Sequence, residues 1–308
     1  MSTTTSTSPD APRPAARTAE VAPFEPRWLE LREGADAAAR ATELLDPLRD
    51  LLRDLPVDRP GSPDRPGRGA GRGLVVHDLG CGTGSMGRWL APRLDGAQHW
   101  VLHDRDPGLL RLAALRAPRA AADGSPVTAE TRRGDLARLT TAALAGASLV
   151  TASALLDVLT ADAVDALAAA CAGAGCPALL TLSVAGRVDL APVHPLDGEI
   201  ADAFNAHQRR GDLLGPDAVG AACEAFDGRG ARVRVHPSPW RLGPEDAALT
   251  AQWLRGWVGA ACEQRPELAA RAGTYLRERL EACAARELRV VVHHSDLLAL
   301  PGTAGGAA

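Results

Sequence analysis

The residues best suited to chemistry form a glycine-rich segment between an apolar run and a helical run. Residues 75–90 read VVHDLGCGTGSMGRWL, in which an apolar strand would end at Asp78 and a helix would begin just after the last glycine of the loop. Gly80, Gly82 and Gly84 allow a tight turn and the close approach of a ligand. The N-terminus of the following helix would add free N–H groups and a partial positive charge. The segment therefore predicts a site for a nucleotide-like ligand.

The loop alone does not distinguish one adenosine cofactor from another, because residues 82–87 also satisfy the dinucleotide-binding pattern GxGxxG. The acidic residues around it are more informative. Asp78 precedes the first glycine, where dinucleotide-binding folds normally run an apolar strand straight into the loop. Asp104 ends a second apolar run about 20 residues later, a spacing that suits either cofactor. A third carboxylate, Asp135, follows Gly134.

These residues resemble the class I S-adenosylmethionine-dependent methyltransferases, whose first motif reads acidic-x-Gly-x-Gly-x-Gly. Four motifs match in the family's order, and the resemblance covers about residues 70–240. It implies that Asp104 binds the ribose hydroxyls and that the carboxylate of Asp135 receives the adenine amino group. Asp78 would pair with the ammonium of the cofactor or organise water around it. The segment ASLVTASALLDVLT (residues 147–160) matches the fourth strand and the loop that leads to the substrate.

The resemblance implies S-adenosyl-L-methionine as the cofactor and methyl transfer to an O or N nucleophile of a small molecule as the reaction. Because the sulfonium already activates the methyl group, catalysis would need mainly alignment and exclusion of water. Two alternatives stay open: a nicotinamide-dependent oxidoreductase, and a non-catalytic scaffold that binds S-adenosylmethionine. The residues expected to bind the cofactor are Asp78, Gly80, Cys81, Gly82, Thr83, Gly84, Asp104, Arg105, Gly134, Asp135, Leu136 and Ala152.

Candidate substrate residues lie on two segments expected at the same edge of the sheet. Asn205, the only asparagine of the chain, and His207 belong to a helical stretch over residues 195–214. His207 could act as a general base because an imidazole titrates near neutrality, although an exposed polar helix face would show the same pattern. Ser153 and Asp157 follow the fourth strand; Asp157 could orient the nucleophile or cap the next helix. We expect Ser153, Asn205 and His207 to bind substrate, and His207 and Asp157 to take part in catalysis.

The composition limits the partners and the compartment. The 308 residues are 46% hydrophobic and 23% charged, with a formal net charge of −4, which does not favour a nucleic-acid partner. The six cysteines form no CxxC motif, and no apolar segment precedes the first helix, so we expect a cytoplasmic protein with no membrane association. Two sets of residues have metal-like spacing: His99, His103, Asp104 and Asp106, and His293, His294 and Asp296. No CxxC motif and no HxxxH motif on a helix supports zinc, so no metal is expected. The oligomeric state is left open.

The elements that must position these residues alternate between apolar strands and helices rich in Ala and Leu. This alternation predicts an α/β fold: a Rossmann-like, doubly wound, seven-stranded and mostly parallel sheet with helices on both faces. Ligands would then bind at the carboxyl ends of the strands. Strands are expected at 74–78, 99–103, 127–132, 148–152, 178–184, 231–237 and 288–294, and helices at 85–93, 107–116, 136–144, 160–173 and 216–227.

The extent of this alternation divides the chain into a catalytic domain and appended segments. Pro47 is the expected break in the N-terminal helices. The expected parts are a disordered tail (1–25), a helical segment (26–55), a flexible Pro/Gly/Arg linker (56–73), a methyltransferase domain (74–300) with inserted helices (195–214, and 244–285 as two helices separated near Pro266), and a disordered tail (301–308).

Overall fold

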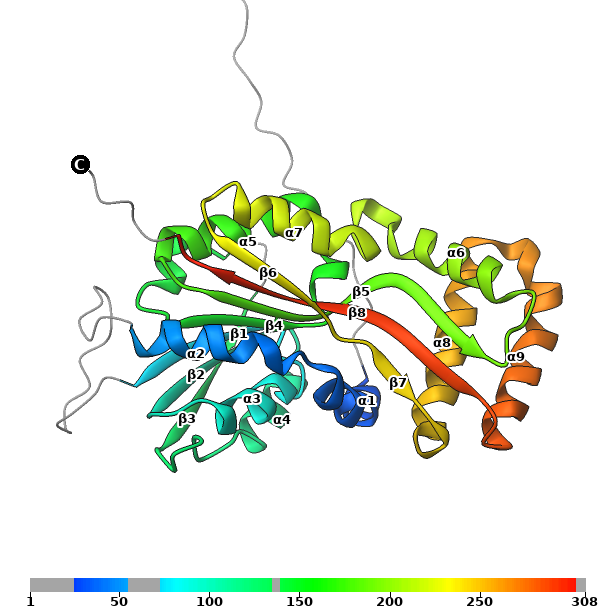
Figure 1. Ribbon diagram of the computed structural model, residues 1–308, viewed down its shortest axis with the longest axis horizontal. Helices are drawn as coiled ribbons and strands as arrows, with labels where there is room; N and C mark the ends of the chain where they lie inside the picture. Colours follow the sequence, from blue (N-terminus) through cyan, green and yellow to red (C-terminus); the bar gives the residue numbers. More distant parts are fainter. Residues whose placement is uncertain (1–24, 55–72, 135–138, 303–308) are drawn as a thin grey trace, which may run out of the picture.

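A single sheet of eight strands organises the protein in the computed structural model, which describes residues 25–54, 73–134 and 139–302 (Figure 1). The strand order is β3-β2-β1-β4-β5-β8-β6, and β7 pairs with β8. Strands β1 to β5 are parallel, whereas β8 runs antiparallel to β5, β6 and β7. The strands are β1 (Leu74–Leu79), β2 (Gln98–Asp104), β3 (Val127–Arg133), β4 (Leu149–Ser153), β5 (Ala178–Ala191), β6 (Arg232–Pro237), β7 (Trp240–Leu242) and β8 (Arg289–Leu300).

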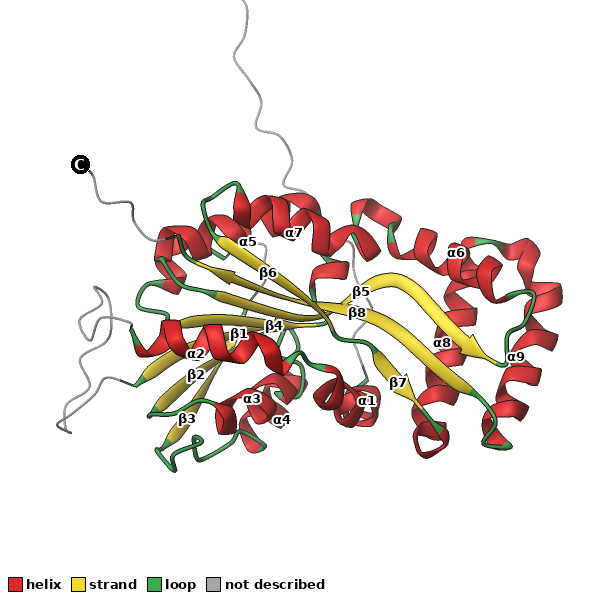
Figure 2. Cartoon of the chain, viewed as in Figure 1, coloured by secondary structure: helices red, strands yellow, loops and turns green. Residues whose placement is uncertain are grey.

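Helices cover both faces of this sheet, which confirms the doubly wound α/β prediction (Figure 2). One face packs against α2 (Leu45–Arg53), α3 (Ser85–Leu90) and α4 (Pro107–Leu115). The other face packs against α5 (Ala161–Ala174) and α7 (Ala218–Asp227). Neighbouring strand residues point to opposite faces, so Leu149 belongs to the first core and Val150 to the second. The expected tails and linker lie outside the described residues, apart from their border positions.

Two strands are longer than the sequence suggested. β5 continues past 184 to Ala191, and β8 continues past 294 to Leu300. The expected end at 184 was therefore wrong. In the structure this half of β5 packs on one side only, so partly buried and exposed residues alternate from Val184 onward. The short β7 adds the eighth strand to the seven that were expected.

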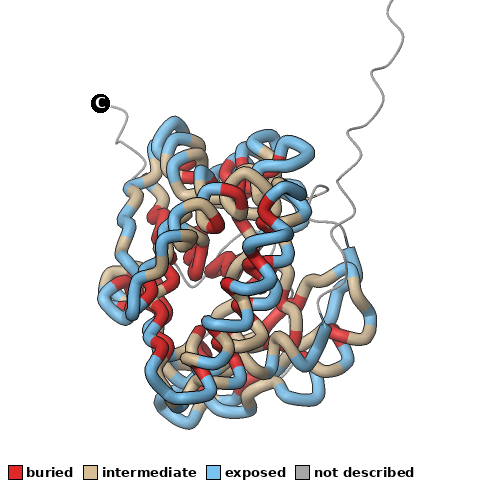
Figure 3. The backbone as a smooth tube through the Cα atoms, turned by 90° about the vertical axis from the view of Figure 1, so that its right-hand side faces the viewer, coloured by how far each residue is buried: buried red, intermediate tan, exposed pale blue. Residues whose placement is uncertain are grey.

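Beyond the main sheet, the long strands pack against three further helices. These are α6 (Asp197–Gln208), α8 (Ala247–Gln264) and α9 (Ala269–Ala284), which build a third core with β7 and the far halves of β5 and β8. Figure 3 views this end and shows the helices turning their buried residues inward. The expected helix 195–214 ends instead at Gln208, because Gly211 adopts a φ of 61° in the turn that follows. The break near Pro266 is confirmed as a 3₁₀ turn, Pro266–Leu268.

Two other helix predictions need correction. The N-terminal helices break at Arg40 and not at Pro47: α1 (Pro26–Ala39) ends there, and a 3₁₀ turn (Thr42–Leu44) leads into α2. Pro47 lies in the first turn of α2, where no backbone N–H is required. Of the expected helix 136–144, residues 136–138 lie outside the described residues, and Thr141–Leu144 forms a 3₁₀ turn. No helix within the described ranges is long and apolar enough to cross a membrane.

Candidate functional site

The glycine-rich loop connects β1 to α3 at the carboxyl edge of the sheet. Gly80, Gly82 and Gly84 have φ values of 61°, 54° and 83°, a left-handed region that other residues adopt only at a cost. The loop is attached to the neighbouring strand, because the N–H of Cys81 donates to the carbonyl of His103 at 2.9 Å. Helix α3 begins at the residue after Gly84. The loop therefore has the shape that the sequence predicted for close approach of a ligand.

Asp78 lies in β1 just before this loop and is 1% exposed. Its Oδ1 accepts a hydrogen bond of 2.8 Å from the Thr151 hydroxyl on β4, whereas its Oδ2 is buried without a partner. Burial raises the pKa of Asp78 to about 7, against the opposing effects of the Thr151 hydrogen bond and the Arg40 charge. A buried carboxylate oxygen without a donor is costly, and it is ready to accept a hydrogen bond from a ligand.

Asp104 holds the glycine loop from the end of β2. Its Oδ2 accepts from the N–H of Gly82 at 2.9 Å, and its Oδ1 accepts from the N–H of Asp106 at 2.9 Å. Gly134 lies beside it, because its N–H donates to the Asp104 carbonyl at 3.2 Å. Each carboxylate oxygen has more than one lone pair, so both retain the capacity to accept a hydroxyl hydrogen bond. The carboxylate thus fixes the loop and stays available to a ligand.

The remaining expected cofactor residues lie at the same edge or outside the described residues. Ala152 on β4 pairs in register with Leu79 on β1. Arg105 is exposed directly after β2, and Thr83 is buried within the loop. Asp135 and Leu136 fall outside the described residues, so their assignment stays a prediction.

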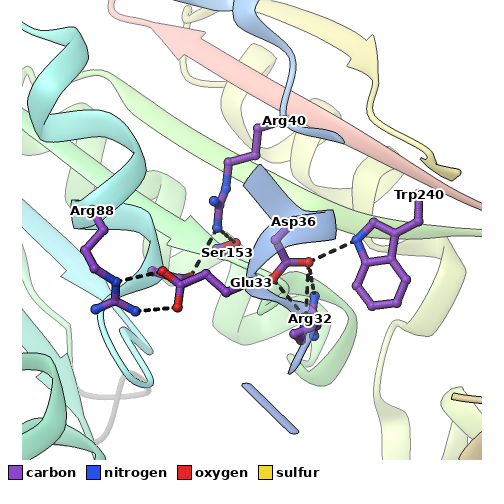
Figure 4. Close-up of polar contacts among 8 residues, drawn as sticks. Arg32, Glu33, Asp36, Arg40, Arg88, Ser153 and Trp240 are labelled. Atoms are coloured by element: carbon purple, nitrogen blue, oxygen red, sulfur yellow. Dashed lines mark hydrogen bonds and ion pairs between the residues drawn. The ribbon is translucent and has the colours of Figure 1, made fainter. Parts of the chain in front are cut away.

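Helix α1 covers the glycine loop, which the sequence had not indicated. The Leu29 side chain lies so close that a Cβ added to Gly82 would be 3.2 Å from its Cδ1. Glu33 accepts two hydrogen bonds of 2.7 Å from Arg88 of α3 (Figure 4). Arg88 also donates to the Thr83 carbonyl at 2.6 Å. Glu30 pairs with Arg116 after α4 at 2.6 Å. The N-terminal segment is therefore a wall of the site.

Three polar residues of this segment follow one another at helical spacing. Arg32 and Asp36 are paired at 2.9 Å, and Asp36 also accepts from the indole N–H of Trp240 at 3.0 Å. Arg40 follows four residues later and donates to the Ser153 hydroxyl at 3.0 Å (Figure 4). Residues spaced by four share a helix face. The recurrence of charged residues at 32, 36 and 40, in a stretch otherwise rich in alanine, is the signal that could have revealed this part of the site.

The part of the chain that carries the glycine loop matches a known family. Residues 76–174 match the family model of a methyltransferase domain. This part of the chain is a methyltransferase domain. The match covers β1, the glycine loop, Asp104 and β4, which are the positions that carry the resemblance in the sequence. The family match does not favour the alternative of a nicotinamide-dependent oxidoreductase. A comparison with curated proteins finds no match for the chain.

The solved structures to which the chain is similar are distant from it in sequence. A methyltransferase from Geobacter sulfurreducens, in complex with S-adenosyl-L-homocysteine, is 17% identical with a TM-score of 0.40; the match covers 90% of this chain and 98% of that one. A cyclopropane synthase from Mycobacterium tuberculosis is 12% identical with a TM-score of 0.39, covering 83% of each chain. Phosphoethanolamine N-methyltransferase 2 from Haemonchus contortus, in complex with S-adenosyl-L-methionine, is 15% identical with a TM-score of 0.37. That match covers 75% of this methyltransferase and about half (49%) of the Haemonchus chain.

The expected substrate residues of the methyltransferase divide into two groups. Ser153 and Asp157 lie beside the cofactor edge: Ser153 contacts Arg40, and Asp157 belongs to the 3₁₀ turn Leu156–Val158 directly after β4. The Oδ1 of Asp157 is buried without a partner, and burial raises the pKa of this carboxyl. The alternative role of Asp157 as a helix cap is wrong, because Thr160 caps α5 by accepting from the N–H of Ala163 at 3.3 Å.

Asn205 and His207, by contrast, have partners away from the glycine loop. The Asn205 amide donates to the Gly186 carbonyl at 2.7 Å, so it supports the bend of β5. His207 lies between α6 and α8, with its Nε2 3.0 Å from Glu263 and its Nδ1 2.8 Å from an Arg210 nitrogen. The structure therefore does not bring these two side chains together with Asp78 and Asp104, and their roles stay predictions.

The histidines of the methyltransferase pair with one another or with protein groups. His77 and His103 are stacked on adjacent strands with ring nitrogens 3.1 Å apart, and burial lowers the pKa of each to about 4. His294 packs against Trp240, and Asp296 accepts from the N–H groups of Ala41 and Leu182. Within the described ranges, no three His, Cys, Asp or Glu residues gather in a way that could hold a metal ion.

Proposed function

We propose that this methyltransferase transfers the methyl group of S-adenosyl-L-methionine to an oxygen or nitrogen atom of a small molecule. The observation that carries the proposal is the unpartnered, buried Oδ2 of Asp78 beside a glycine loop that Asp104 holds in place. These groups suit the two ends of the cofactor. Asp78 would accept a hydrogen bond from its ammonium, and the free lone pairs of Asp104 would accept from the ribose hydroxyls.

We infer a small substrate because helix α1 covers the glycine loop. Leu29 lies against Gly82, and Glu33 binds Arg88 beside the same loop. A substrate that reaches the methyl group must fit beneath α1 or displace it, which favours a small molecule over a folded polymer. The net charge of −4 agrees with this, because a polyanion would be repelled. The six cysteines, all of which the structure describes, form no disulfide bond, which supports the proposal of a cytoplasmic protein.

When bound, the cofactor supplies a methyl group activated by a cationic sulfur. The chain would align the nucleophile with this group and exclude water around it. A nucleophile that carries a proton must also lose it, and Asp157 is the nearer of the two proposed acceptors to β4. Its buried, unpartnered Oδ1 can accept that proton, and burial raises the pKa of this carboxyl, which makes it a stronger base. His207 remains the second proposed acceptor.

Isothermal titration calorimetry with S-adenosyl-L-methionine and S-adenosyl-L-homocysteine tests the cofactor, and absence of binding to both would refute the proposal. Methyl transfer from labelled cofactor to the small-molecule and macromolecular fractions of a cell extract tests the substrate class. Label confined to protein or nucleic acid would contradict a small-molecule substrate.

Two variants distinguish the proton acceptors. Asp157→Asn and His207→Ala should both bind S-adenosyl-L-homocysteine normally, and the variant that loses turnover by about 10²–10⁴ identifies the group in use. If both variants keep full turnover, neither residue is a general base.

A further inference from the structure

Arg40 is a buried cation that forms no ion pair with a described carboxylate. The residue is 3% exposed. Its Nη2 donates to the hydroxyls of Ser153 and Ser85 at 3.0 and 3.3 Å, whereas its Nε and Nη1 are buried without a partner. Arg279 is as deeply buried but lies 2.6 Å from Asp197, as expected of a structural arginine. Burial of an unpaired charge is costly in free energy. We therefore expect Arg40 to pair with an anionic group of a ligand.

The position of Arg40 is fixed by contacts that need no ligand. Its guanidinium lies over the ring of Trp89, 5.4 Å from the ring centroid. The N–H of the next residue, Ala41, donates to Oδ2 of Asp296 at 2.8 Å, and Asp296 is fully buried in β8. Burial lowers the pKa of Arg40, although the charges of Asp36 and Asp296 oppose this. The guanidinium is therefore held in place before any partner arrives.

Asp78 and Arg40 each form a hydrogen bond with a residue of the same strand, β4. Asp78 accepts from Thr151, and Arg40 donates to Ser153. These two β4 residues are two positions apart, so their side chains leave the same face of the strand roughly 6.5–7 Å from each other. A carboxylate and a guanidinium, each with buried polar atoms that lack a partner, thus flank one end of the glycine loop. An α-amino acid suits both, because it carries an ammonium and a carboxylate on one carbon atom.

We propose that Arg40 binds the carboxylate of the methionine end of S-adenosyl-L-methionine and so selects ligands with an intact amino-acid group. The inference rests on the proposed function and deepens it. The Nε and Nη1 atoms leave three N–H groups to donate, and hydrogen bonds from a guanidinium to a carboxylate are among the stronger ones in proteins. The N-terminal segment then contributes a binding residue to a cofactor site whose other described parts come from residues 76–174.

The direct test compares two ligands that differ in this carboxylate. Decarboxylated S-adenosylmethionine keeps the ammonium, the sulfonium and the adenosine. By isothermal titration calorimetry the wild-type protein should bind S-adenosyl-L-methionine about tenfold to a hundredfold more tightly than the decarboxylated form. Arg40→Met should remove this preference by weakening only the binding of the carboxylate-bearing ligand.

Arg93→Met is the matched control, because the Arg93 guanidinium lies 5.0 Å from the centroid of the same Trp89 ring. This variant should keep the wild-type preference. Arg40→Lys retains the charge and should give an intermediate preference for the ligand with the carboxylate. If Arg40→Met does not fold, Arg40→Lys replaces it in the test.

Equal binding of the two ligands by the wild-type protein would overturn the inference without any variant. Arg40→Met with an unchanged preference would also overturn it. So would unchanged cofactor affinity with a raised KM for the substrate, which would place the carboxylate on the substrate instead. Failure of the wild-type protein to bind either ligand would refute the proposed function, which is a different result from binding both equally.

Discussion

Cofactor binding should depend on pH through Asp78. In the free protein burial raises the pKa of this carboxyl to about 7. A ligand ammonium at Oδ2 favours the ionised form, so the bound state has a lower pKa and binding releases a proton. Affinity must therefore rise with pH while Asp78 is partly protonated in the free protein. With a pKa of about 7, the ionised fraction is roughly 0.09 at pH 6.0 and roughly 0.76 at pH 7.5, so the affinity should increase about eightfold.

Calorimetric titration of S-adenosyl-L-homocysteine at these two pH values measures the change. The same titration in two buffers of different ionisation enthalpy counts the protons released at pH 6.0, which should approach one. Asp78→Asn cannot ionise, so it should bind more weakly and show no such pH dependence. Thr151→Val removes the hydroxyl that donates to Oδ1 and opposes the rise in pKa. In this variant the pH dependence should move to higher pH.

The reasoning would be refuted by a wild-type affinity that is the same at pH 6.0 and 7.5 with no proton released. It would also be refuted if Asp78→Asn kept the eightfold dependence, because another group would then be titrating.

Three further predictions concern the residues around this site. Asp104→Ala should stay folded but bind S-adenosyl-L-homocysteine about 1.5–3 kcal/mol more weakly; unchanged calorimetric affinity would remove Asp104 from the ribose site. Burial lowers the pKa of His77 and His103 to about 4 from 6.5. The unfolded chain therefore binds more protons than the native state between these values, and the unfolding temperature should fall as the pH drops from 6.5 toward 4. His103→Gln should reduce that fall, and an identical fall would show that the pair does not cause it. Glu33→Gln weakens the link to Arg88, so hydrogen exchange should become faster within α1 only; faster exchange throughout the protein would contradict a local role.

The cofactor edge could be predicted because its signals are local in sequence. The glycines 80, 82 and 84 need unusual backbone angles, and those angles recur in the structure. The position of Asp104 at the end of a strand follows from the alternation of strands and helices. Such features depend on residues within one strand, loop and helix. They do not require knowledge of what packs against that unit.

The other half of the site could not be predicted because it depends on contacts between distant segments. Arg40 reaches Ser153 across 113 positions, and the register that brings them together is set by the packing of α1 and by Asp296. His207 depends on distant contacts in the same way. Its residue type favours a catalytic role, but the sequence did not indicate that Glu263, 56 positions away, would be its partner in the structure. The residue type determines what chemistry a side chain can do, whereas tertiary packing determines which groups lie next to it.

The place of β8 in the sheet sets the order in which the protein can be assembled. This strand is nearest the C-terminus of all eight, yet it lies in the interior of the sheet between β5 and β6. During synthesis the edges of β5 and β6 that pair with β8 stay without a partner strand until β8 leaves the ribosome. This lengthens the time in which either strand can pair with a wrong strand. Packing of the N-terminal segment is delayed as well, because Asp296 of β8 accepts a hydrogen bond from the N–H of Ala41. Helix α1 precedes every strand of the sheet in the chain, yet Ala41, which follows it, gains its contact with Asp296 only after β8 is in place.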